Sequence, residues 1–295
     1  MSAQQNLVPN GSFEDTVNCP SNYDELNKTM FWYKPTQGTP DLFNSCNTIP
    51  YFIGTPSNGG GYQFPKDGRA YAGFAVNFDT SNGALLNYRE YLQIKLISKL
   101  DAGKKYTVSF FVSRADSFFI ALKDIGAFIS KFPIGCNCSS TLILSPQVVY
   151  GNFVTDNNNW TEVKGEFLAN GTEEFLTLGY FKNNNSTDTV FLKPTNDLTA
   201  YYYLDKVSIF QSPDLLVLAN VFTPNNDGIN DTFRSPNDAV EICIYNRWGI
   251  KIFGSKEKFD WNGNSDANEP CSAGVYYYII QTETETYKGF LELIK

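Results

Sequence analysis

Short apolar and aromatic runs recur along the chain, separated by clusters of asparagine, glycine, aspartate and proline. Runs of this length, bounded by residues that favour turns, are typical of strands in two-sheet sandwiches. The clearest of them cover residues 106–112, 175–181, 201–210 and 274–281. One stretch, SFFIALKDIGAFIS at residues 117–130, favours a helical turn instead. The pattern therefore predicts an almost entirely β protein.

The strand pattern is interrupted in the segment FQSPDLL, which contains Pro213 and Asp214. A chain of 295 residues is long enough for two domains with separate cores. We therefore predict one domain over residues 1–213 and a second over residues 214–295. In the second domain, short apolar segments joined by glycine-containing turns are typical of a small immunoglobulin-like β-sandwich.

Composition supports this picture and excludes several kinds of chemistry. The chain has 24 Phe and 18 Tyr, which favours strands over helices, and its net charge of −8 disfavours nucleic acid as a partner. It has no histidine, so Ser-His-Asp and Cys-His nucleophiles and histidine zinc sites are excluded. A glycoside hydrolase that uses two carboxylates needs no histidine. Asp41, Glu90 and Asp116 are candidates for it, but no motif pairs them.

The chain has six cysteines without the doubled CxxC spacing of a zinc site. An even number suits disulfides in an oxidising compartment, so export is expected, and residues 1–5 fit the remnant of a removed signal peptide behind an added methionine. A local Cys136–Cys138 bridge competes with binding of a soft metal, and a Cys243–Cys271 bridge competes with two buried thiols. The favoured pairs are Cys19–Cys46, Cys136–Cys138 and Cys243–Cys271.

The segment FTPNNDGINDTF, residues 222–233, gathers asparagine and aspartate around Gly228. A calcium loop with Gly228 at its sixth position would begin at Thr223 and end at Arg234, and both are wrong ligands for such a loop. An Asx turn explains the same residues without an ion. Further on, Asn246 to Gly249 (NRWG) predict a tight turn between two strands.

These segments, with DWNG and the final AGVYYYII…GFLELIK, resemble the gliding-motility-associated C-terminal domain of Bacteroidetes, the type B sorting signal of the type IX secretion system. The resemblance implies partners that read or receive the domain: the translocon, an outer-membrane shuttle protein and an outer-membrane anchoring partner. It also implies that the protein ends at the cell surface or outside the cell. The residues implied in recognition are Phe222, Thr223, Pro224, Asn225, Asp227, Gly228, Asn230, Asp231, Asn246, Arg247, Trp248 and Gly249.

The first domain runs from NLVPNGSFED to YYYLDKVSIF and resembles the galactose-binding-like jelly rolls of carbohydrate-binding modules. The resemblance implies a structural Ca²⁺ near the first and last strands, with Glu14 and Asp205 at the matching positions. Carboxylate oxygens suit this ion. The alternative is a solvated acidic pair at the strand ends.

A saccharide site needs aromatic faces for stacking and polar groups for the hydroxyls. The candidates are Trp32, Tyr33, Gln37, Asp41 and Trp160, although Trp32 fits a core position equally well. We therefore expect a non-enzymatic secreted or surface protein whose first domain is an adhesin or glycan binder. The alternatives are an accessory component of the secretion or gliding apparatus that binds other proteins, and a histidine-free glycoside hydrolase.

Overall fold

The computed structural model describes residues 5–78, 87–182, 188–212, 218–236, 239–256, 260–282 and 286–295. The chain folds as two compact units, residues 4–213 and 214–295. The predicted domain boundary at residues 213 and 214 lies outside the described residues, as do residues 1–4 of the expected signal-peptide remnant. Within the described residues, no helix is long and apolar enough to cross a membrane.

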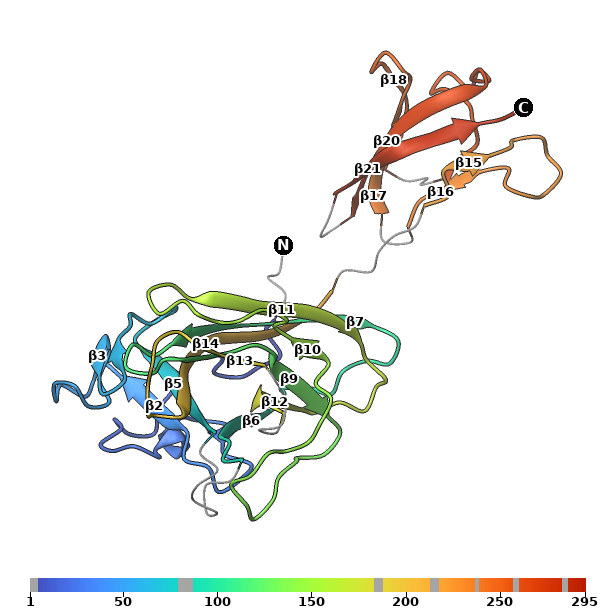
Figure 1. Cartoon of the computed structure of the whole chain (residues 1–295). Coiled ribbons are helices and arrows are strands. Elements are labelled where there is room, and N and C mark those ends of the chain that lie inside the picture. Colours follow the sequence, from blue (N-terminus) through green and yellow to red (C-terminus); the bar gives the residue numbers. More distant parts are fainter. Residues whose placement is uncertain are drawn as a thin grey trace. The chain divides into compact units, whose positions relative to one another are not determined.

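The N-terminal unit is a sandwich of two five-stranded antiparallel sheets (Figure 1). The first sheet has the order β1 (Trp32–Tyr33), β6 (Tyr91–Lys95), β12 (Phe175–Tyr180), β9 (Ile125–Ser130) and β10 (Val148–Val149). The second has the order β11 (Thr161–Leu168), β7 (Lys105–Arg114), β14 (Thr199–Gln211), β5 (Ala70–Asn77) and β2 (Asp41–Asn44). The smaller elements are η1 (Leu26–Lys28), β3 (Ser57–Asn58), β4 (Gly61–Tyr62), β8 (Ile120–Leu122) and β13 (Thr189–Phe191).

Alternation of side chains along the strands builds the core between the two sheets. In β7, Val108 and Phe110 point into the core, whereas Ser109 and Phe111 point away from it. The prediction of an all-β fold is confirmed. The helical turn predicted within residues 117–130 is wrong, because β8 and β9 occupy this stretch and their alternate apolar residues enter the same core.

A second apolar cluster lies on the outer face of the sheet that contains β2, β5 and β14. Phe43, Tyr71 and Tyr203 pack there with ring centroids 4.9–5.5 Å apart, and Ile53 from the following loop is also fully buried among them. Segments outside the two main sheets therefore cover this end of the outer face, while the end formed by β7, β11 and the last residues of β14 remains open.

The C-terminal unit is one five-stranded sheet with a two-stranded sheet beside it. The large sheet has the order β15 (Val221–Phe222), β21 (Thr286–Leu293), β20 (Gly274–Thr282), β17 (Ala239–Tyr245) and β18 (Lys251–Ser255). The small sheet pairs β16 (Phe233–Arg234) with β19 (Asp260–Trp261). Ile242, Ile280 and Leu291 from the large sheet pack with Phe233 and Trp261 from the small one, so only one face of the large sheet contributes to this core.

The turn predicted at Asn246–Gly249 joins β17 to β18. Gly249 has φ +76°, which lies in the left-handed region that favours glycine, and its N–H donates to Asn246 O at 2.9 Å. The Asn246 side-chain oxygen accepts from the N–H groups of Trp248 and Ile250, both at 3.0 Å. The turn is therefore fixed by its own asparagine and glycine.

Two of the three predicted disulfides are present, Cys19–Cys46 and Cys136–Cys138. The predicted Cys243–Cys271 bridge is wrong, because both residues are free thiols. Cys243 lies in β17 between Ile242 and Ile244, which point into the core, so its own side chain points to the outer face. Cys271 packs against the core itself. The sheet therefore separates the two sulfur atoms.

Candidate functional site

The residues predicted to bind saccharide do not form one site. Trp32 is 3% exposed, its ring centroid lies 4.9 Å from that of Phe13, and its indole N–H donates to Asn10 O at 2.9 Å. The ligand-stacking role predicted for Trp32 is therefore wrong, since the side chain belongs to the core of the N-terminal unit.

Tyr33 and Gln37 lie where another segment crosses the outside of the first sheet. The Tyr33 hydroxyl donates to Gln93 Oε1 at 2.8 Å, and Gln93 Nε2 in turn donates to Ile134 O at 3.1 Å. Gln37 is exposed, with its backbone N–H donating to Cys138 O at 2.7 Å. The segment containing the Cys136–Cys138 disulfide thus covers this face, and both predicted residues help to hold it.

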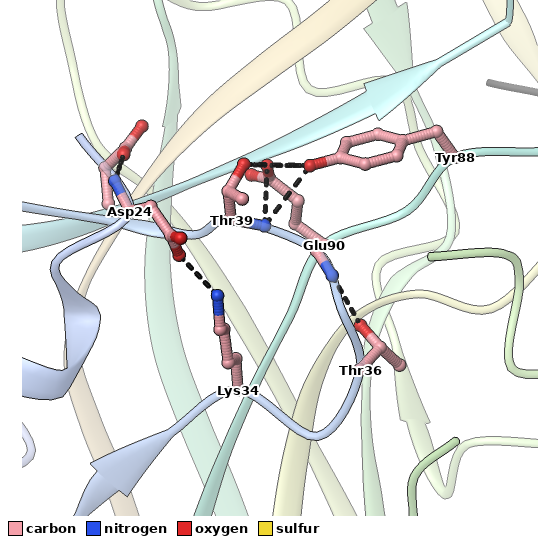
Figure 2. Close-up of polar contacts among 8 residues, drawn as sticks. Asp24, Lys34, Thr36, Thr39, Tyr88 and Glu90 are labelled. Atoms are coloured by element: carbon pink, nitrogen blue, oxygen red, sulfur yellow. Dashed lines mark hydrogen bonds and ion pairs between the residues drawn. The ribbon is translucent and has the colours of Figure 1, made fainter. Parts of the chain in front are cut away.

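Asp41 of β2 is buried near a second buried carboxylate, Glu90. The Asp41 carboxylate accepts from the backbone N–H of Asp24 at 2.7 Å and from the Tyr201 hydroxyl at 2.5 Å. Figure 2 shows the neighbouring contacts, in which Asp24 also pairs with Lys34 at 2.6 Å. Asp41 is 5% exposed, so no face of it is open to a ligand.

The Glu90 carboxylate accepts four hydrogen bonds, and the donors of three of them, from Thr39 and Tyr88, are drawn in Figure 2. The N–H and hydroxyl of Thr39 donate to Oε1 at 3.2 and 2.8 Å, and the Tyr88 hydroxyl donates to it at 2.7 Å. The Ala75 N–H donates to Oε2 at 2.6 Å. Glu90 therefore ties the loop after β1 to strand β5.

Burial and proximity perturb both acids. Burial, followed by the charge of Glu90, raises the pKa of Asp41 from its ordinary 3.8 to about 7. Burial also raises the pKa of Glu90. Asp116, the third hydrolase candidate, accepts from Tyr62 N–H at 2.8 Å and from Asn157 Nδ2 at 2.7 Å. All three carboxylates hold loops in place, a structural use that gives the hydrolase alternative no support.

The two residues predicted to bind calcium contact one loop, residues 66–70. Glu14 Oε1 accepts from the N–H groups of Arg69 and Ala70 at 2.7 and 2.8 Å. Asp205 Oδ2 accepts from the N–H groups of Lys66 and Asp67 at 2.8 and 3.0 Å.

These N–H groups direct positive charge at the oxygens that a cation would use, so the residues as placed do not fit a shared calcium ion. No group of three or more aspartate, glutamate, cysteine or histidine side chains that could hold a metal occurs in the described part of the chain. Calcium binding itself stays a prediction.

Trp160 lies on the other sheet, just before β11. Its indole N–H donates to Phe64 O at 2.9 Å and its ring lies 5.8 Å from that of Tyr71, which leaves it partly buried at the edge of the outer aromatic cluster. Tyr33 and Trp160 therefore belong to different sheets and do not line one cleft.

The open end of that outer face holds a groove of about 340 Å³ that our sequence reasoning missed. Strand β7 contributes Ser109 and Phe111, and the Ser109 hydroxyl donates to Glu162 Oε1 of β11 at 2.8 Å. The groove is lined by Asn6, Gly11, Ser12, Asp67, Ser109, Phe111, Glu162, Lys206, Val207, Ser208 and Phe210.

A bulge in β14 between Asp205 and Ser208 creates this lining. It shifts the register so that Val207 and Ile209 enter the core while Ser208 and Phe210 face outward. Alternation in YTVSFFV could have identified Phe111 from the sequence, whereas the bulge leaves no comparable pattern.

In the C-terminal unit, the 222–233 segment is a network of Asx turns. Asp231 Oδ1 accepts from Asn225 and Asn226 N–H at 3.0 and 2.7 Å, and its Oδ2 accepts from Gly228 N–H at 2.8 Å. Asp227 Oδ1 accepts from the N–H of residue 229 at 2.7 Å. Because these carboxylates bond the loop's own backbone, the geometry favours the turn over a metal loop.

The comparisons with known proteins divide along the same two units. Residues 216–293 match the family model described as the CHU_C Type IX secretion signal domain. The C-terminal unit is therefore a type IX secretion signal, and the protein is exported across the outer membrane to the cell surface or the medium. A search of curated proteins finds no match.

Solved structures with a related arrangement match the N-terminal part. The CBM22-1 xylan-binding domain of Paenibacillus barcinonensis Xyn10C is 14% identical, with 72% of this chain and 97% of that chain covered and a TM-score of 0.39. The K1 cleaved adhesin domain of Lys-gingipain from Porphyromonas gingivalis W83 is 15% identical, with 68% of this chain and 96% of that chain covered and a TM-score of 0.33. TmCBM61 in complex with beta-1,4-galactotriose is 11% identical, with 70% of this chain and 99% of that chain covered and a TM-score of 0.33.

Proposed function

We propose that this exported protein is a non-enzymatic surface or secreted glycan binder, an adhesin whose N-terminal unit holds saccharide in the groove on β7, β11 and β14. The observation that supports the proposal most directly is the lining of this groove. Partly exposed Phe111 and Phe210 lie beside the carboxylates of Asp67 and Glu162 and beside serine hydroxyls.

This combination suits a sugar better than a purely apolar or purely charged ligand. Aromatic rings pack against the C–H faces of a pyranose, while carboxylates and hydroxyls bond its O–H groups. The Glu162 carboxylate already accepts from a serine hydroxyl at 2.8 Å, which is the kind of contact that a sugar hydroxyl makes.

The charges around the groove favour an uncharged ligand. Lys206 lines the groove with Asp67 and Glu162, and Lys66 Nζ lies 4.4 Å from the centroid of the Phe111 ring. Two exposed cations thus accompany two exposed carboxylates. With no excess of either sign, an ionic ligand gains little, so the proposed ligand is a neutral polysaccharide.

Retention of the full chain on an array of neutral polysaccharides tests the proposal. Phe111→Ala removes the aromatic platform and should weaken binding about fivefold, which corresponds to about 1 kcal/mol. Glu162→Gln should weaken it by a similar factor. The matched control is Phe132→Ala, which removes an exposed ring outside the groove and should leave binding unchanged.

Two results would remove the proposal: no binding by the wild type to any polysaccharide, or equal binding by Phe111→Ala and Phe132→Ala. The first would favour the alternative in which the N-terminal unit is an accessory component that contacts other proteins.

A further inference from the structure

The outer face of the large C-terminal sheet carries a row of aromatic residues that the core does not use. Tyr245 of β17 is directly opposite Tyr277 of β20, and Tyr277 is directly opposite Phe290 of β21. Tyr277 is 49% exposed and Phe290 is 56% exposed. Three adjacent strands therefore present one continuous aromatic row to the outside.

Neighbouring residues extend this surface. Ile279 lies next to Tyr277 on the same face, opposite Lys288, and Val275 at the other side is 44% exposed. The aromatic row, Ile279 and the turn after β17 line a groove of about 630 Å³. A contiguous exposed apolar surface of this kind is typical of a site that another molecule covers.

Cations border the groove although the unit as a whole is acidic. Residues 214–295 contain 7 basic and 12 acidic side chains, a net charge of 7 − 12 = −5. Yet Arg247 and Lys288 line the groove, and none of its described lining residues is acidic. Lys251 also lies directly opposite Tyr245 in the sheet. Among the described residues of this face, the acids Glu241 and Glu292 lie outside the groove lining.

Tyrosine, tryptophan and arginine are the residue types that contribute most to protein–protein binding. Next to the row, the Arg247 guanidinium lies 4.8 Å from the Trp248 ring, and Trp248 is 72% exposed. The turn that presents both residues is fixed by Asn246 and Gly249, so little backbone conformational entropy is lost when a partner covers them.

We infer that this face, defined as Tyr245, Arg247, Tyr277, Ile279, Lys288 and Phe290, is the surface through which the signal domain docks on the secretion machinery. The docking partner is a protein of that machinery whose contact surface offers apolar side chains bordered by carboxylates. The inference rests on the assignment of residues 216–293 as a type IX secretion signal. It keeps Arg247 from the sequence-based expectation, which placed recognition in the 222–231 loop and the 246–249 turn, and it assigns the other contacts to the outer face of the sheet in place of the 222–231 loop.

The test is export of the full chain in a bacterium with a type IX system, measured as protein at the surface and in the medium relative to the periplasm. Tyr277→Thr with Phe290→Thr should lower the exported fraction about tenfold or more. Arg247→Glu with Lys288→Glu should do the same by reversing the charge. The matched control Ile229→Thr changes an exposed apolar residue of the 222–231 loop and should leave export unchanged.

Threonine favours strands, and the substituted side chains are exposed, so the C-terminal unit should stay folded in both double variants. Circular dichroism of the purified proteins checks this. If the Tyr277→Thr, Phe290→Thr variant unfolds, export of the Arg247→Glu, Lys288→Glu variant alone tests the docking face. Wild-type export by both folded double variants, or by the one that remains folded, would overturn the inference.

A photo-crosslinking residue at position 277 identifies the occupant in living cells. An adduct with a known outer-membrane component of the type IX machinery supports the inference, whereas an adduct only with a second copy of this chain or with a lipid overturns it. Deletion of residues 214–295 separates the two levels of the argument. Export of the truncated protein would refute the signal assignment itself, while its retention together with export of the double variants would refute only the docking face.

Discussion

Replacing the buried Asp41 by asparagine should make the stability of the N-terminal unit less dependent on pH. Asparagine keeps the shape of the side chain: its oxygen can accept from Asp24 N–H and its amide can donate to the Tyr201 oxygen, so both contacts of Asp41 survive. What the substitution removes is a proton that the folded state binds more tightly than the unfolded state.

The sign and size follow from the pKa of Asp41, which burial and the charge of Glu90 raise from 3.8 to about 7. Between these values the folded state holds the proton and the unfolded state does not, so stability is highest at low pH and falls as the pH rises towards 7. From about pH 5 to about pH 8 the loss covers slightly less than two pH units at about 1.4 kcal/mol per unit, or about 2.5 kcal/mol. Burial also raises the pKa of Asp205, to about 8, so the wild type loses further stability over the same range.

Calorimetry of the full chain at several pH values measures this effect on the transition that is absent from an isolated fragment 214–295. About 2.5 kcal/mol corresponds to roughly 5–10 °C in a unit of this size, so Asp41→Asn should flatten the fall in melting temperature by that amount. The exposed control Asp101→Asn should behave as the wild type. No imidazole titrates in this window, because the chain has no histidine. Equal slopes for Asp41→Asn and the wild type would refute the reasoning.

The remaining predictions concern the core, the thiols and calcium. Trp32→Ala should destabilise the N-terminal unit by about 3–5 kcal/mol in urea unfolding, and Trp160→Ala by clearly less, because only Trp32 is fully packed. Alkylation of the unfolded, unreduced chain should modify two cysteines, as counted by mass spectrometry. Fewer than two modified cysteines would support the Cys243–Cys271 bridge after all. Melts of the N-terminal unit in calcium and in chelator test the predicted ion: N–H groups occupy Glu14 and Asp205, so this geometry favours coincident curves, whereas a higher melting temperature in calcium would support the predicted site.

Local patterns in the sequence were enough to predict the fold class, because strands can be recognised from alternating apolar and polar residues and from the turn residues between them. The segment YTVSFFV alternates along β7, and Asn246 with Gly249 specify the turn between β17 and β18. The same pattern misled the prediction for residues 117–130, because apolar residues are so frequent there that they fit a helical period as well as a strand period. Tertiary packing of β8 and β9 then decided in favour of strands.

The candidate site was harder to predict, because its residues meet only through the fold. Nothing local shows that Trp32 enters the core while the neighbouring Tyr33 does not, or that a bulge after Asp205 turns Phe210 outward. Cys243 and Cys271 have an acceptable spacing for a bridge. Because side chains alternate along β17, however, the Cys243 side chain lies on the face of the sheet opposite to the core, away from Cys271.

The way the N-terminal unit uses its buried carboxylates supports a binding role over a catalytic one. Asp41, Glu90, Glu173 and Asp205 are all at most 5% exposed, and each accepts at least one backbone N–H from a loop. A sandwich with long connections needs such acceptors, because loop N–H groups buried without partners are costly. A general acid or base must instead reach a substrate proton. The carboxylates exposed in the groove, Asp67 and Glu162, accept from serine hydroxyls, an arrangement that suits the sugar hydroxyls of the proposed ligand.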